Sequence, residues 1–243
     1  NYPPTPSVGT APPWQTIHQG GTYDGFLTKM KPDGGIVWSI FVGGSSSDYL
    51  YDVALDSSDN PHVGGRTYST NLTGGNYTIQ SSEIFITKVL KDDATPAFTY
   101  VHKGDDYDTL YELAVDTSGN VYATGYTNSA ITFTAGSTIA QATFQGGSYD
   151  AWAAKVNSSG NLVWATYLGG DDTDYGYAIA EKSGDIYILG QTGSETISGA
   201  TPYTWQGGSW DGFVAKYEST GALAFFTYFG GSCLDYAKDI ALY

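Results

Sequence analysis

The sequence predicts an all-β fold, a β-propeller of four four-stranded blades, and three observations support this prediction. A segment of the form acid-x-aromatic-x-x-Lys occurs four times, so the sequence repeats roughly every 60 residues. Runs of five to eight mostly apolar residues alternate with clusters of Gly, Asn, Asp and Ser, a pattern typical of short strands and turns. No window shows the sustained periodicity of an amphipathic helix.

Each repeat contains the sequence of four short strands. The acid-x-aromatic-x-x-Lys strand ends at Lys29, Lys88, Lys155 and Lys216, and we expect these lysines to pair with aspartates at the seams between blades. The strand after it is predicted at 36–42, 97–102, 162–168 and 223–229. A third strand follows an aspartate and carries Ala54, Ala114, Ala180 or Ala241, and a fourth carries Gly65, Gly125 or Gly190. Neighbouring blades must cover each other's faces, and we expect the alanine-bearing strand near the crowded axis.

The predicted organisation is a proline-rich arm or edge strand at 1–18 and one propeller domain at 19–243. The repeats span about 19–80, 81–145, 146–206 and 207–243. The chain enters before the third strand of one unit and leaves after the first strand of another. The sequence therefore predicts a ring closed by pairing of the N- and C-terminal segments.

Four short motifs carry a resemblance to a known family. They are Asp-x-Phe-x-x-Lys, Trp-x-x-x-x-Gly-Gly, Asp-x-Ser-Gly-Asn-x-Tyr and Gly-x-Thr, and residues 150–192 show them best. The second copy departs most, with Glu83 in place of aspartate and Lys103 in place of the first glycine of the pair. The chain resembles the SBBP-type β-propeller repeat of bacteria and archaea over nearly everything after Ile17. The resemblance implies a propeller fold at the cell surface or outside the cell.

Charge and composition exclude several partners. The chain has 25 acidic and ten basic residues, a net charge of −15, so it would repel nucleic acid and anionic membrane surfaces. No apolar run is long enough to insert into a membrane. Cys233 is the single cysteine, so packing must supply the stability that disulfides give small exported domains. We expect a secreted or cell-surface glycoprotein: the sole methionine is Met30, which fits removal of a leader, and sequons begin at Asn71, Asn76 and Asn157.

The recurring acids have two interpretations. Capping of turn amides is favoured, because every repeat places a short acid next to a glycine turn. The alternative is calcium binding at two acid-rich turns, although neither turn has EF-hand spacing. The candidate ligands are Asp105, Asp106, Asp108, Asp171, Asp172 and Asp174. No other cofactor is predicted.

Aromatic residues at fixed repeat positions, such as Phe26, Trp152 and Phe213, are expected to pack between blades. Aromatic residues off this pattern are the candidates for stacking against a ligand, namely Trp14, Tyr203 and Trp205. The three histidines lie at unrelated repeat positions and have no metal-ligand spacing, so no catalytic site is predicted.

The functional prediction is a non-catalytic, extracellular or cell-envelope scaffold that works through protein partners or self-assembly, including as a subunit of a filament. The alternative is a carbohydrate-binding, lectin-like module or a calcium-dependent binding module.

Overall fold

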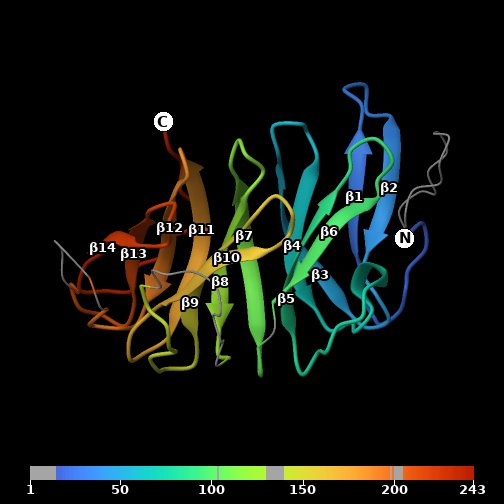
Figure 1. The fold of residues 1–243 in the computed structure, drawn as a ribbon. Coiled ribbons are helices and arrows are strands. Elements are labelled where there is room, and N and C mark those ends of the chain that lie inside the picture. Colours follow the sequence, from blue (N-terminus) through green and yellow to red (C-terminus); the bar gives the residue numbers. More distant parts are fainter. Residues whose placement is uncertain (1–14, 103, 130–139, 198, 200–204) are drawn as a thin grey trace.

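The computed structural model describes residues 15–102, 104–129, 140–197, 199 and 205–243 (Figure 1). Their strands form three four-stranded antiparallel sheets and one two-stranded sheet. Within these residues the single helical element is the short 3₁₀ turn Leu72–Gly74. The prediction of an all-β fold with short repeated strands is therefore confirmed.

The three complete sheets are here named blades A, B and C, and each runs through its strands in chain order. Blade A contains β3 (Asp48–Leu55), β4 (Pro61–Thr67), β5 (Glu83–Val89) and β6 (Pro96–Val101). Blade B contains β7 (Asp108–Val115), β8 (Val121–Thr127), β9 (Asp150–Val156) and β10 (Leu162–Leu168). Blade C contains β11 (Asp174–Lys182), β12 (Asp185–Thr192), β13 (Asp211–Tyr217) and β14 (Leu223–Phe229).

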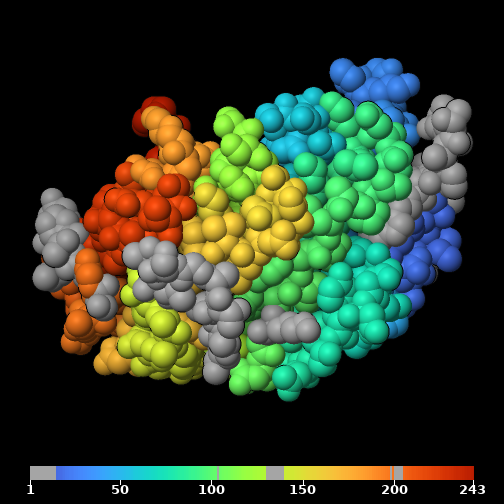
Figure 2. All heavy atoms as spheres, in the orientation of Figure 1, coloured from blue at the N-terminus to red at the C-terminus, as the bar shows by residue number. Residues whose placement is uncertain are grey.

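The blades stack through their inner strands, β3, β7 and β11, which are the alanine-bearing strands. Strand β7 contacts β3 and β4 of blade A on one side and β11 of blade C on the other. Leu110 and Leu113 of β7 belong to the same buried cluster as Ile84 and Ile86 of β5. Each sheet thus buries an apolar face against the next blade, as the repeat pattern predicted, and Figure 2 shows the blades side by side in sequence order.

The remaining sheet contains only β1 (Gly25–Met30) and β2 (Ile36–Val42), and we call it the half-blade. Strands β1 and β2 occupy the places of the third and fourth strands of a blade, and β1 contacts β3 of blade A. No described strand supplies the two places on the inner side of the half-blade.

The predicted closure of a fourth blade by the two chain ends is not formed by the described residues. Residues 230–243 include no strand, and Ala237 and Ile240 pack instead against Ala178 and Leu189 of blade C. The half-blade and blade C lie at opposite ends of the array (Figure 1). The described array is open because its last segment uses one face against blade C and pairs with no other strand.

Candidate functional site: a tyrosine face and buried carboxylate pairs

A tyrosine stands at the irregular position of every inner strand. The antiparallel register shifts between Leu50 and Asp52 in β3, between Leu110 and Glu112 in β7, and between Gly176 and Ala178 in β11. The residues left out of the three ladders are Tyr51, Tyr111 and Tyr177. Because a β-bulge redirects the side chain of the extra residue, the three blades present their tyrosines in the same way.

These tyrosines form one continuous aromatic surface across the three blades. The ring centroids of Tyr51 and Tyr111 are 6.3 Å apart, and those of Tyr111 and Tyr177 are 5.5 Å apart. Tyr126 of β8 lies 4.8 Å from Tyr149 and 5.4 Å from Tyr111. We call this surface the tyrosine face, and its members are Tyr49, Tyr51, Tyr107, Tyr111, Tyr126, Tyr149, Tyr175, Tyr177 and Trp210.

A cation lies at each end of the tyrosine face. The guanidinium carbon of Arg66 is 4.6 Å from the ring centroid of Tyr49 and 4.9 Å from that of Tyr107. Lys238 Nζ lies 4.7 Å from the ring centroid of Tyr177. Such cation–π contacts favour a fixed position for the charge.

Arg66 is the only arginine of a chain with 25 acids, yet no described acid forms an ion pair with it. Its Nε is buried and has no hydrogen-bond partner among the described residues. A buried donor without a partner costs free energy, and this positive group is therefore the most distinctive polar feature of the tyrosine face.

The hydroxyl groups of the three bulge tyrosines stay protonated at physiological pH. Burial, with smaller contributions from neighbouring tyrosines, raises the pKa of Tyr111 and raises that of Tyr177 to about 12. Burial also raises the pKa of Tyr51, against the opposing effect of the Arg66 charge. These three side chains are therefore neutral, and their hydroxyls can donate and accept hydrogen bonds.

The recurring acids cap turns, as the favoured interpretation predicted. In blade B, Gln145 N donates to Asp150 Oδ2 at 2.8 Å. In blade C, Gly170 N donates to Asp174 Oδ2 at 2.9 Å, and Ser194 Oγ donates to the same oxygen at 3.1 Å. The amides of Gln19, Gly44, Gln206 and Gly231 make the corresponding bonds to Asp24, Asp48, Asp211 and Asp235.

In several of these acids the second carboxyl oxygen, Oδ1, is buried. It has no described hydrogen-bond partner in Asp24, Asp150 and Asp211, whereas side-chain hydrogen bonds from Thr67 and Thr192 reach the carboxyl groups of Asp48 and Asp174. Burial, together with the nearby charge of Asp174, raises the pKa of Asp150 to about 8, and burial raises that of Asp174 to about 7. The seam between blades B and C therefore holds a pair of carboxyl groups that resists full ionisation at neutral pH. Asp24 and Asp48 form the corresponding pair between the half-blade and blade A, and burial raises the pKa of both.

A glycine separates the two carboxyls of each pair. A Cβ on Gly169 would lie 2.7 Å from Asp150 Oδ1 and 2.6 Å from Asp174 Oδ2. Gly43 and Gly230 stand in the corresponding places beside Asp24 and Asp211. The glycine that follows β2, β10 and β14 is thus required because a side chain there would collide with these carboxyl groups.

The structure divides the six calcium candidates between two environments. Asp174 is buried and caps a turn, and Asp108 is buried and accepts a hydrogen bond from Thr127 Oγ1, whereas Asp105, Asp106, Asp171 and Asp172 are exposed on the turns. In the described part of the chain, no group of three or more Asp, Glu, His or Cys side chains is arranged to hold a metal ion. Calcium binding stays a prediction.

The ligand and glycosylation candidates are placed as follows. Trp14 and Tyr203 lie outside the described residues, and Trp205 is half-buried with its ring edge-on to Tyr228 at 6.2 Å. Asn71 and Asn76 are exposed, while Asn157 is half-buried with Oδ1 accepting from Ser159 N and Asn161 N.

The sequence analysis missed the tyrosine face because it assigned aromatic residues at fixed repeat positions to packing. The signal was the spacing Asp-Tyr-x-Tyr at 48–51 and again at 174–177, with Tyr111 at the matching place of the middle copy. Side chains two residues apart on a strand share a side, so this spacing marks one surface.

The lysine prediction was partly wrong. Ion pairs with aspartate were expected between blades, but Lys88 Nζ pairs with Asp56 at 2.8 Å inside blade A, and Lys216 Nζ with Asp185 at 2.8 Å inside blade C. Lys155 instead reaches the next blade, where its Nζ donates to Ser219 O together with Trp164 Nε1.

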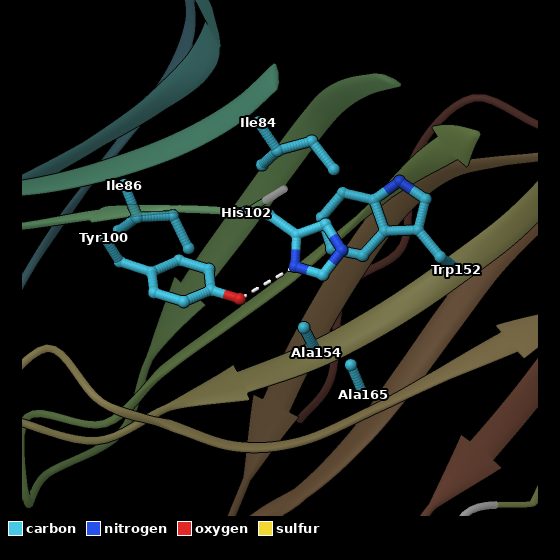
Figure 3. A pocket seen from close by; sticks show the side chains of 7 residues that line it. All are labelled: Ile84, Ile86, Tyr100, His102, Trp152, Ala154 and Ala165. Atoms are coloured by element: carbon cyan, nitrogen blue, oxygen red, sulfur yellow. Dashed lines mark hydrogen bonds between the residues drawn. The ribbon is translucent and has the colours of Figure 1, made fainter. Parts of the chain in front are cut away.

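One enclosed cavity contains a histidine (Figure 3). Tyr100 Oη and His102 Nδ1 are 2.8 Å apart, and burial lowers the pKa of His102 to about 4, so the ring is neutral. The cavity measures about 10 Å³, room for about one water molecule, and its other walls are Ile84, Ile86, Trp152, Ala154 and Ala165. It is too small to admit a substrate.

The fold and these surfaces define an all-β array of propeller-type blades with a shared aromatic face. In comparison with known families, residues 103–131 match the SBBP β-propeller repeat, and this segment includes β7 and β8. The match confirms the resemblance noted from the sequence motifs. No curated protein matches the chain. Among the described residues there is no helix long and apolar enough to cross a membrane.

Proposed function

We propose that this chain is a non-catalytic interaction scaffold that works at the cell surface or outside the cell and holds its partner on the tyrosine face. The observation that carries the proposal is the alignment of Tyr51, Tyr111 and Tyr177 at three equivalent bulges, ending at Arg66. β-Propeller repeats supply rigid frames for such surfaces, and a repeated bulge is a feature that pairing alone does not need.

The physical properties of the face suit binding. Tyrosine offers a large, rigid contact area at a low cost in side-chain entropy, and it is enriched at interfaces. Tyr51 is exposed, and the rings of Tyr111 and Tyr177 are half-buried, so their edges remain accessible while neighbouring rings fix their positions. An arginine without an acidic partner adds a site for an anionic group.

The proposed location outside the cell rests on what the resemblance to the SBBP repeat implies and on the sequons that begin at Asn71, Asn76 and Asn157. The scaffold role is supported by the recurrence, in three of the four repeats, of acids that accept hydrogen bonds from equivalent turn amides. Groups that recur in this way serve the blade architecture, so the tyrosine face stands out as the surface available for a partner.

A second candidate function is carbohydrate binding, which the tyrosine rings favour because sugar rings stack on aromatic side chains. Arg66 would favour sugars that carry a carboxylate or sulfate group, because its guanidinium can form charge-assisted hydrogen bonds with an anion.

The test uses a photo-crosslinking amino acid at position 51 and, as the control, at position 33 on the exposed β1–β2 turn. In the extracellular fraction of the native cells, we expect a discrete protein adduct from position 51 that disappears in the Arg66→Gln variant. A glycan array probed with both variants separates the second candidate, which predicts Arg66-dependent binding of acidic glycans. If position 51 gives no specific adduct and the protein also binds no glycan, the tyrosine face is excluded as a contact surface.

A further inference from the structure

The half-blade leaves part of blade A uncovered. Phe26 of β1 is 61% exposed, whereas Phe85, Trp152 and Phe213 at the same repeat position are 0 to 3% exposed. Val53 of β3 is 49% exposed, whereas its counterparts Leu113 and Ile179 are each 4% exposed. Side-chain positions that are buried at the other seams are therefore exposed to solvent here. Together with Leu27, Leu55 and Tyr51, Phe26 and Val53 line a groove between β1 and β3.

The two complete seams show what covers this surface in a finished blade. The second strand of the preceding blade contributes Gly64, whose α-carbon approaches the side chains of Leu110 and Leu113. The preceding inner strand also contributes an acid: Asp52 Oδ2 accepts from Leu113 N at 2.9 Å, and Glu112 Oε2 accepts from Ile179 N at 2.8 Å. The acid always stands four residues after the first aspartate of its strand.

The C-terminal segment has the sequence of an inner strand. Asp235 corresponds to Asp48, Ala241 to Ala54, and Asp239 to Asp52 and Glu112. One side of this segment is already used, because Ala237 packs on Ala178 and Leu189 of blade C. Asp239 is exposed, and in the described part of the chain it faces no following blade.

We propose that residues 231–243 of one copy of this chain dock into the groove between β1 and β3 of a second copy, with Asp239 accepting a hydrogen bond from Val53 N. The proposal rests on the proposed scaffold function and names a second copy as one of its partners. The two surfaces would contact each other as blades A, B and C do. In those seams, the acid of one inner strand accepts a hydrogen bond from the backbone N–H of the residue that follows the bulge of the next inner strand.

The chain's own segment leaves the groove empty, because it lies on blade C at the far end of the array from β1 (Figure 1). The donor and acceptor surfaces are different parts of the molecule, so the contact is head-to-tail and repeats from copy to copy. Such contacts close into rings or continue as filaments. The net charge of −15 opposes association, and salt should therefore strengthen it by screening.

Sedimentation velocity over a range of concentrations tests the contact. We expect wild-type protein to associate reversibly, and Val53→Lys to raise the dissociation constant at least tenfold because a charge would enter the apolar groove. Asp239→Asn should weaken association less. The matched control is Phe229→Lys, which changes an apolar residue 40% exposed on the outer strand β14 and should associate as wild type.

A disulfide trap identifies the occupant. Val53→Cys and Asp239→Cys are combined with Cys233→Ser, and all three positions lie at exposed sites, so the variant should fold. Oxidation should yield linked dimers and longer species. A wild-type chain that stays monomeric into the millimolar range, or oxidation to a linked monomer only, would overturn the proposal. Failure of this contact leaves partner binding at the tyrosine face to be tested separately through Tyr111 and Tyr177, because these two residues do not line the groove, although Tyr51 does.

Discussion

Replacing Gly125 with alanine should destabilise blade B severely, because the new methyl group would meet backbone. A Cβ at Gly125 would lie 2.0 Å from Thr109 O and 3.0 Å from Leu110 Cα, beside the bulge that holds Tyr111. The same approach occurs at Gly65, where the nearest atom is Tyr49 O, and at Gly190, where it is Tyr175 O. The glycine of the Gly-x-Thr motif is therefore needed for the close pairing of the inner and second strands.

The size of the effect follows from what has to move. Inserting a methyl group into a packed core costs about 1–3 kcal/mol when side chains adjust. Here the obstacle is a carbonyl in a strand ladder, so β7 and β8 must separate and lose at least one hydrogen bond, a further loss of about 1 kcal/mol. We expect Gly125→Ala to lower the free energy of unfolding by about 2–4 kcal/mol.

Urea denaturation followed by tryptophan fluorescence measures this difference. The matched control is Gly231→Ala, because no atom lies within 4 Å of a Cβ at Gly231, and its effect should stay within about 0.5 kcal/mol. A Gly125→Ala protein as stable as this control would refute the argument that backbone contact selects glycine here.

Two further predictions concern charged groups. Because the pKa values of Asp150 and Asp174 are raised to about 8 and about 7, the folded protein holds protons that the unfolded chain releases above pH 4. The free energy of unfolding should therefore fall as the pH rises from 4 to 7, by at most about 1.4 kcal/mol per pH unit for each group. Asp150→Asn should flatten that slope and raise the melting temperature at pH 8, and an unchanged slope would count against the carboxyl pair. Lys88→Met should cost about 2 kcal/mol in thermal or urea unfolding, because it leaves the buried Asp56 carboxylate without its cation. Lys216→Met, whose Asp185 partner is more exposed, should cost less, and equal losses would contradict this reasoning.

The strands were predictable because their pattern is local and repeats. The predicted strands 36–42, 162–168 and 223–229 are the observed bounds of β2, β10 and β14. The predicted strand 97–102 begins and ends one residue later than β6, which spans Pro96–Val101. Turn capping was predictable for the same reason, because an acid and a turn amide only a few residues apart fix the contact.

Features that depend on distant segments were not predictable in the same way. Closure of the ring required the C-terminal segment to pair with a strand at the other end, but its apolar side packs on blade C. The lysines were expected to reach between blades, yet Asp56 lies on the turn between β3 and β4 and is nearer to Lys88. The tyrosine face depends on bulges, and the repeated Asp-Tyr-x-Tyr spacing does not by itself show that the strand register shifts at its second tyrosine.

We propose that a second molecule completes the half-blade. Hydrogen–deuterium exchange at low and high protein concentration can show this completion, by comparing β1 and β3 with their counterparts β9 and β7. We predict fast exchange of β1 and β3 in dilute protein and marked protection in concentrated protein, while β7 and β9 stay protected throughout. Equal protection of β1 and β9 at every concentration would contradict completion by a second molecule.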